Sequence, residues 1–223
     1  MAGLPVYLEV GSKKVFACAV EWPGWARPAR NEQEALEALA QYLLRYEKVV
    51  TAAGLKVPGA ARRGDFAVLA RLEGDATTDF GAPGAVPEFD LEPPTTAKWK
   101  RQVALLRGCW EVFDEAVAGG STRLKKGPRG GGRDRDQVAA HVIDAEVSYA
   151  RRLGAKLSAP RPSDAAGLRA SRDELVARLD ATRQSGPITG PRGGKGWPAA
   201  YAVRRLAWHV MDHAWEIEDK SEP

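Results

Sequence analysis

A short segment rich in proline divides the chain into two halves with different hydrophobic patterns. The segment covers residues 81–94 and contains four prolines, which fix the backbone and remove amide donors, so it cannot form a helix. Short β-prone runs precede it, whereas apolar residues recur at helical spacing after it. The sequence therefore predicts an α+β chain with a small domain at 1–80, a linker at 81–94 and an all-helical domain at 95–223.

The first half has the pattern of a small sheet with one helix. Residues 6–10 and 15–22 are β-prone runs joined by a Gly-Ser turn, which predicts a hairpin. Asn31 is placed to cap the helix that follows, and Glu34 completes a capping box three residues later. Residues 66–72 are typical of a closing strand. The predicted order is β-β-α-β.

Four amphipathic stretches follow the linker, at residues 96–118, 134–153, 163–184 and 198–219. The first carries a single apolar stripe along its length. Four helices of about twenty residues fit a four-helix bundle. The stripe of the first helix consists of Trp99, Val103, Leu106, Trp110, Phe113 and Val117.

The chain has three histidines, and two of them lie four residues apart. Four residues are about one helical turn, so His209 and His213 project from the same face of the last helix. That face lies at the border between apolar and polar residues of the last helix. His141 lies in the second helix, at the same kind of border. Three nitrogen ligands with room for a fourth are typical of a catalytic metal site. The alternative for each residue alone is a hydrogen-bonded core histidine.

The depths of the three histidines match better if the second and fourth helices run antiparallel than if they run parallel. His141 lies about 10 Å from the start of its helix, and the pair lies about 12 Å from the end of the fourth. The third helix must then begin at the same end as the second. The segment 154–162 must cross over, and it can span roughly 30 Å when extended.

Charged residues near the histidines are candidates for chemistry. Asp144, Asp212 and Glu216 are expected to orient the ligands or to act as a general base. The alternative for these acids is a solvated helix face. Arg205 and Arg133 are candidates for binding an anionic substrate. The alternatives are a surface salt bridge for the first and a solvated loop for the second.

Two stretches of the helical half carry a family resemblance: VAAHVIDAE at 138–146 and HVMDH at 209–213. One histidine on the second helix and a His-x-x-x-His pair on the fourth resemble the DinB-like metalloprotein superfamily, over about residues 95–220. The resemblance implies a four-helix bundle with a crossover between helices two and three. It also implies a divalent metal on His141, His209 and His213, with zinc or nickel foremost and iron or manganese as alternatives.

In function, the DinB-like resemblance implies activation of water or a low-molecular-weight thiol against a small substrate. The reaction would be of thiol transferase, isomerase or hydrolase type. The superfamily also includes members with no known activity. A non-catalytic binding protein stabilised by metal is therefore the alternative.

The stretch VEWPGW at 20–25, followed by NEQEAL at 31–36, resembles the small HicB-like domain. HicB proteins are antitoxins with a separate DNA-binding segment, which this sequence does not contain, so only the fold is carried over. An RNA-associated regulator acting through this module ranks last, because aromatic and basic residues do not alternate along the strands. An exposed sheet edge would allow two chains to pair as a homodimer.

The composition bounds the partners and the location. A net charge of +4 is well short of the dense basic surface of a nucleic-acid binder, so a nucleic-acid partner is not expected. The two cysteines, Cys18 and Cys109, lie far apart and predict no disulfide framework. No apolar run approaches ~20 residues, and no secretory signal is recognisable at the start. These features predict a cytoplasmic protein with no membrane partner.

Overall fold

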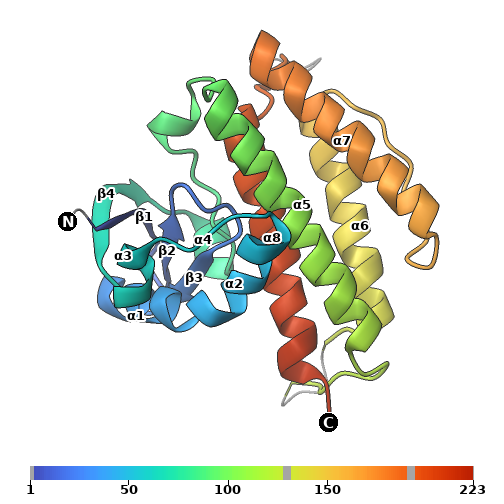
Figure 1. The fold of residues 1–223 in the computed structure, drawn as a ribbon, viewed down its shortest axis with the longest axis horizontal. Coiled ribbons are helices and arrows are strands. Elements are labelled where there is room, and N and C mark those ends of the chain that lie inside the picture. The colour runs from blue at the N-terminus through green and yellow to red at the C-terminus, as the bar shows by residue number, and fades with distance from the viewer. Residues whose placement is uncertain (1–2, 128–131, 190–193, 223) are drawn as a thin grey trace.

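The computed structural model describes residues 3–127, 132–189 and 194–222, and its fold is α+β as predicted (Figure 1). A four-stranded sheet with short helices lies on one side, and four long helices lie on the other. The first part consists of β1 (Leu4–Val10), β2 (Val15–Ala19), β3 (Ala26–Ala29), α1 (Glu32–Gln41), α2 (Leu43–Ala52), α3 (Gly59–Arg63) and β4 (Phe66–Glu73). The short helix α4 (Ala76–Phe80) and the 3-10 helix η1 (Glu88–Asp90) follow, and then the four long helices α5 (Thr96–Gly119), α6 (Arg135–Arg152), α7 (Ala165–Ser185) and α8 (Ala199–Lys220).

The sheet has the order β3-β2-β1-β4, with β4 parallel to β1 and the other neighbours antiparallel. The predicted hairpin is confirmed, because Val10 pairs with Val15 and Val6 with Ala19. The predicted β-β-α-β order omits β3. That strand is four residues long and contains Pro28, so its β propensity is weak, and it is tolerated because it lies at the sheet edge.

The single helix predicted after Asn31 is two helices, α1 and α2, which meet at Tyr42. The predicted cap is confirmed: the Asn31 side chain accepts a hydrogen bond from the amide of Glu34 at 2.9 Å. The Glu34 carboxylate accepts from the amide of Arg30 rather than from the cap residue itself. At the break, the ring of Tyr42 packs edge-on against Trp215 of α8, with centroids 4.8 Å apart.

The four long helices begin and end within two residues of the predicted limits. The start of α6 and the end of α8 lie together. Arg135, the first residue of α6, donates to the carbonyl of Gly120, and in the connection between Gly120 and α6 the amide of Lys125 donates to the carbonyl of Lys220 at the end of α8. At the opposite end, the amide of Trp197, just before α8, donates to the carbonyl of Arg152, the last residue of α6, at 3.2 Å. Helices α6 and α8 are therefore antiparallel. The connection between α6 and α7 runs back along the helices, so α7 has the direction of α6 (Figure 1).

The proline-rich segment packs against both halves of the molecule. The buried carboxylate of Glu9 accepts hydrogen bonds from the amides of Gly84 and Ala85 at 2.8 and 3.0 Å. Arg204 of α8 forms two 2.9 Å hydrogen bonds with Asp90, and both side chains are buried. One apolar core also continues from the sheet into the long helices. The sheet, the segment and α8 therefore form one packed unit.

A buried polar cluster joins α5, α6 and α7. The indole of Trp110 donates to the Glu146 carboxylate at 2.6 Å, and the Arg172 guanidinium lies 4.0 Å from the same group. Arg172 also forms two hydrogen bonds with Asp114, at 2.6 and 2.9 Å. Burial raises the pKa of Glu146 to about 7, against the lowering effect of Arg172 and Trp110.

Glu146→Gln should make the protein more stable at pH 8 and leave its stability at pH 4 almost unchanged. The pKa of this carboxyl is higher in the folded chain than in the unfolded one, so the protonated form stabilises the fold. This contribution to the free energy of unfolding is complete below the unfolded pKa and is lost as pH rises through about 7. The gain at pH 8 should reach up to about 3 kcal/mol. Urea unfolding at both pH values measures it. Glu174→Gln, at an exposed position, is the control, and an equal change at both pH values contradicts the assignment.

Two further features bear on the sequence predictions. Among the described residues, no helix has the length and apolar character needed to cross a membrane. Both cysteines are free and buried. Cys109 packs against the carbonyl of Pro23, with its sulfur 3.9 Å from the oxygen, and burial raises the pKa of its thiol.

Candidate metal centre

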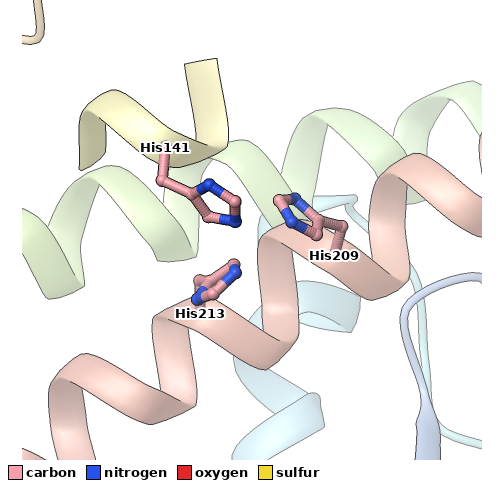
Figure 2. A group of neighbouring side chains, drawn as sticks. All are labelled: His141, His209 and His213. Carbon is pink, nitrogen blue, oxygen red and sulfur yellow. The ribbon is translucent and has the colours of Figure 1, made fainter. Parts of the chain in front are cut away.

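The three histidines converge between α6 and α8. His141 reaches across from α6, and His209 and His213 point toward it from consecutive turns of α8 (Figure 2). One nitrogen from each ring lies within 4.8 Å of the others, and the ring centroids are 4.6 to 5.1 Å apart. Nitrogens around one tetrahedral zinc ion are about 3.3 Å apart. Small changes of side-chain angle would bring these three onto one cation.

Two of the three imidazoles do not behave as hydrogen-bonded core histidines. His209 is 8% exposed, and its Nδ1 is buried without a hydrogen-bond partner among the described residues. His141 likewise makes no hydrogen bond to any residue that the structure describes. A buried polar atom is normally satisfied. The unpaired rings therefore fit the donor set of a metal site.

The surroundings of His141 and His209 favour the neutral imidazole, which is the form that binds a metal ion. The pKa of His209 is lowered to about 2, first by burial and then by its two histidine neighbours. Burial is also the main cause that lowers the pKa of His141. The positive charges of Arg205 and Arg133 lower the pKa of His209 further.

Glu216, predicted as a catalytic or orienting acid, lies directly behind one of the histidines. Its carboxylate is 2.7 Å from Nδ1 of His213 and accepts a hydrogen bond from Lys220 at 2.6 Å. The hydrogen bond to His213 is the main cause that lowers the pKa of Glu216, to about 2. A carboxylate that accepts from Nδ1–H leaves Nε2 free to bind a metal. Glu216 is therefore placed to orient a ligand.

The other two predicted acids lie outside the triad. Asp212 points toward the sheet and pairs with Arg27 of β3 at 3.2 Å. That guanidinium also lies over the ring of Tyr42, 4.0 Å from its centroid. Asp144 is exposed on α6 and forms no ion pair within the described part of the chain. Asp212 thus links the sheet to α8, whereas Asp144 has no partner within the described residues.

The two predicted arginines differ in how firmly they are held. Arg205 donates to the carbonyl of Pro83 at 2.6 Å and lies over the ring of Trp208, 4.7 Å from its centroid. Arg133 is exposed just before α6. Residues 128–131 of the predicted anion-attracting loop lie outside the described residues.

An aromatic wall beside the triad was missed by the sequence reasoning. The ring of Tyr149 meets His209 edge-on at 5.7 Å, and Trp197 lies 5.0 Å from Tyr149. Tyr149 follows His141 by eight residues, or about two helical turns, so both lie on one face of α6. That spacing is the signal that could have identified it.

The fold and the triad together define an α+β protein with a candidate three-histidine metal centre. Comparison with protein-family models, with curated proteins and with solved structures finds no match to this chain.

Proposed function

We propose that this chain is a DinB-like metalloprotein in which α5–α8 form a four-helix bundle around a divalent metal ion. His141, His209 and His213 would hold the ion, with zinc or nickel as the first candidates. The observation that carries the proposal is the convergence of three imidazoles from two helices, two of them without hydrogen bonds to described residues. The antiparallel α6 and α8 and the long connection into α7 support the bundle arrangement.

The exposure of the triad favours a catalytic centre over a closed structural one. His209 is buried, while His141 and His213 are half-buried, so the centre is open to solvent on their side. Three protein ligands leave a fourth position for substrate or water. When bound, the ion would polarise a substrate and acidify water or a thiol.

The chain's own residues then take distinct roles in a metal-dependent transferase, isomerase or hydrolase. Glu216 holds the His213 ring in place. Arg205, beside the aromatic wall, would bind the charged group of a small anionic substrate, with Arg133 as a second cation. Asp144 has no protein partner among the described residues and is the candidate base for a thiol cosubstrate or water.

Metal titration of the apoprotein tests the first part of the proposal. Protein stripped with a chelator should bind one Zn²⁺ or Ni²⁺ per chain in calorimetry, and the purified protein should contain metal by elemental analysis. The absence of stoichiometric uptake would contradict the metal centre. The loaded protein is then assayed with glutathione and a small electrophile, and with ester substrates. Turnover above that of the apoprotein supports the enzyme.

A second candidate is a non-catalytic protein in which metal stabilises a binding surface on the HicB-like half. Its support is the position of α8, which carries two ligands and also packs on the sheet through Trp208 against Phe16 of β2. The edge strand β4 exposes Leu69, which suits pairing of two chains. Metal uptake without turnover, together with a dimer in sedimentation experiments, would favour this candidate.

Glu216→Gln should weaken metal binding by about 10- to 100-fold. The amide keeps the size of the side chain but loses the charge that orients and polarises His213. Competition with a chelating dye measures the affinity. Glu218→Gln is the matched control, since Glu218 lies on the same helix but binds Arg45 and Lys48. An E216Q affinity equal to that of the control would remove the assigned role.

A further inference from the structure

A cavity of about 380 Å³ lies on the opposite side of α6 from the metal centre. Ala139 and Ile143 line it and flank His141 by two residues, which places them on the other face of the helix. The volume lies within the range of small-molecule sites. Its apolar walls come from α5, α6, α7 and the connection before α7, and include Phe113, Val117, Ala139, Ile143, Pro162 and Leu168.

The charged residues at this cavity leave one positive charge without a counter-charge. They are Asp114, Arg169 and Arg172. Arg172 is 7% exposed and is bound by the Asp114 carboxylate through two hydrogen bonds, with the buried Glu146 carboxylate 4.0 Å away on its other side, so its charge is offset. Arg169 is exposed at the edge and forms no ion pair with any described residue. An apolar cavity bordered by an unpaired cation is complementary to an amphipathic anion.

A neighbouring cavity of about 480 Å³ restricts the charge of the ligand. It shares Arg169, Arg172 and Asp114 with the first cavity, and it adds the Arg107–Asp173 ion pair and the acidic residues Glu111 and Glu115. A second negative charge on the ligand would meet these carboxylates. The arrangement therefore favours one anionic group held at Arg169, with the rest of the ligand apolar.

We propose that the cavity between α5, α6 and α7 binds an amphipathic monoanion, a hydrocarbon chain with a single carboxylate. The hydrocarbon part of the ligand would lie among the apolar side chains of the cavity. Its carboxylate would lie against Arg169, with Arg172 behind it. This site does not require the metal centre, because none of the three histidines lines it.

Calorimetric titration of the full chain with decanoate, below its micelle concentration, tests the site. One saturable site is expected, with decanedioate binding at least about tenfold more weakly because of its second charge. Arg169→Ala should weaken decanoate binding about tenfold by removing one charge-assisted hydrogen bond, and Arg169→Glu should abolish it. Arg178→Ala, on the opposite face of α7, is the matched control and should bind like the unmodified protein.

Ala165→Trp tests the location of the site. Ala165 is the exposed first residue of α7 and lines the cavity, so an indole there should fill the space without disturbing the core. Decanoate binding should be lost while the unfolding midpoint is kept. Absence of saturable binding overturns the proposal. So does an equal loss in R169A and R178A, or decanoate affinity that A165W leaves intact.

Discussion

Replacing His209 with alanine should weaken metal binding by about 100- to 1,000-fold while the helices stay folded. A three-histidine site loses one of its donors, and this ring is the most buried of the three. The fold should persist because His209 makes no hydrogen bond to any described residue. Affinity is measured by chelator competition, and folding by circular dichroism in the presence of chelator.

Tyr149→Phe is the control for this experiment, because it keeps the ring that meets His209 and removes no donor of the triad. Its metal affinity should equal that of the unmodified protein. His141→Ala and His213→Ala should resemble His209→Ala, since the three rings contribute to one site. Retention of one tightly bound ion in all three variants would show that the metal binds elsewhere.

Asp90→Asn should lower the free energy of unfolding by about 3–5 kcal/mol. The substitution leaves the guanidinium of Arg204 buried without its counter-charge, and Arg204 is 5% exposed. Two backbone carbonyls at the end of β2, those of Ala19 and Val20, still accept hydrogen bonds from it but carry no charge. Urea denaturation measures the loss, with the dependence of the free energy of unfolding on urea concentration fitted to one shared value for both proteins.

An exposed pair provides the comparison for Asp90→Asn. Asp65 pairs with Arg63 at 2.6 Å, and both side chains are nearly half exposed. Asp65→Asn should therefore change the stability little. The double substitution Asp90→Leu with Arg204→Met should recover part of the loss, because it removes both buried charges. A D90N loss no larger than that of D65N would show that the buried pair does not hold the segment to α8.

Local periodicity made the long helices and the triad predictable. The limits of α5 to α8 follow from apolar spacing, and the caps that the structure shows at Thr95 and Asp134 are local as well. The His209 and His213 pair follows from one helical turn. The meeting with His141 follows from matched depth along antiparallel helices. Each of these inferences depends only on residues close together in sequence or on helix geometry.

The features that the sequence did not predict depend on partners far apart along the chain. Arg27 meets Asp212 across a separation of 185 residues, and Glu9 meets the amides of 84–85 across about 75. Residues 26–29 become a strand only because β2 supplies their partners. Pairings of this kind leave no periodic signal, so Asp212 could be placed beside His213 but not connected to the sheet.

The Arg204–Asp90 pair has a consequence for where the polypeptide can be divided. Cutting before Thr95 would remove Asp90, the partner of Arg204, and would expose the apolar face of α8 on which Trp208 packs against Phe16. The excised helices should then cluster in solution instead of behaving as an autonomous unit. Recombination that joined the helices to another N-terminal domain would expose the same apolar face and the same unpaired arginine, which favours inheritance of the two halves together.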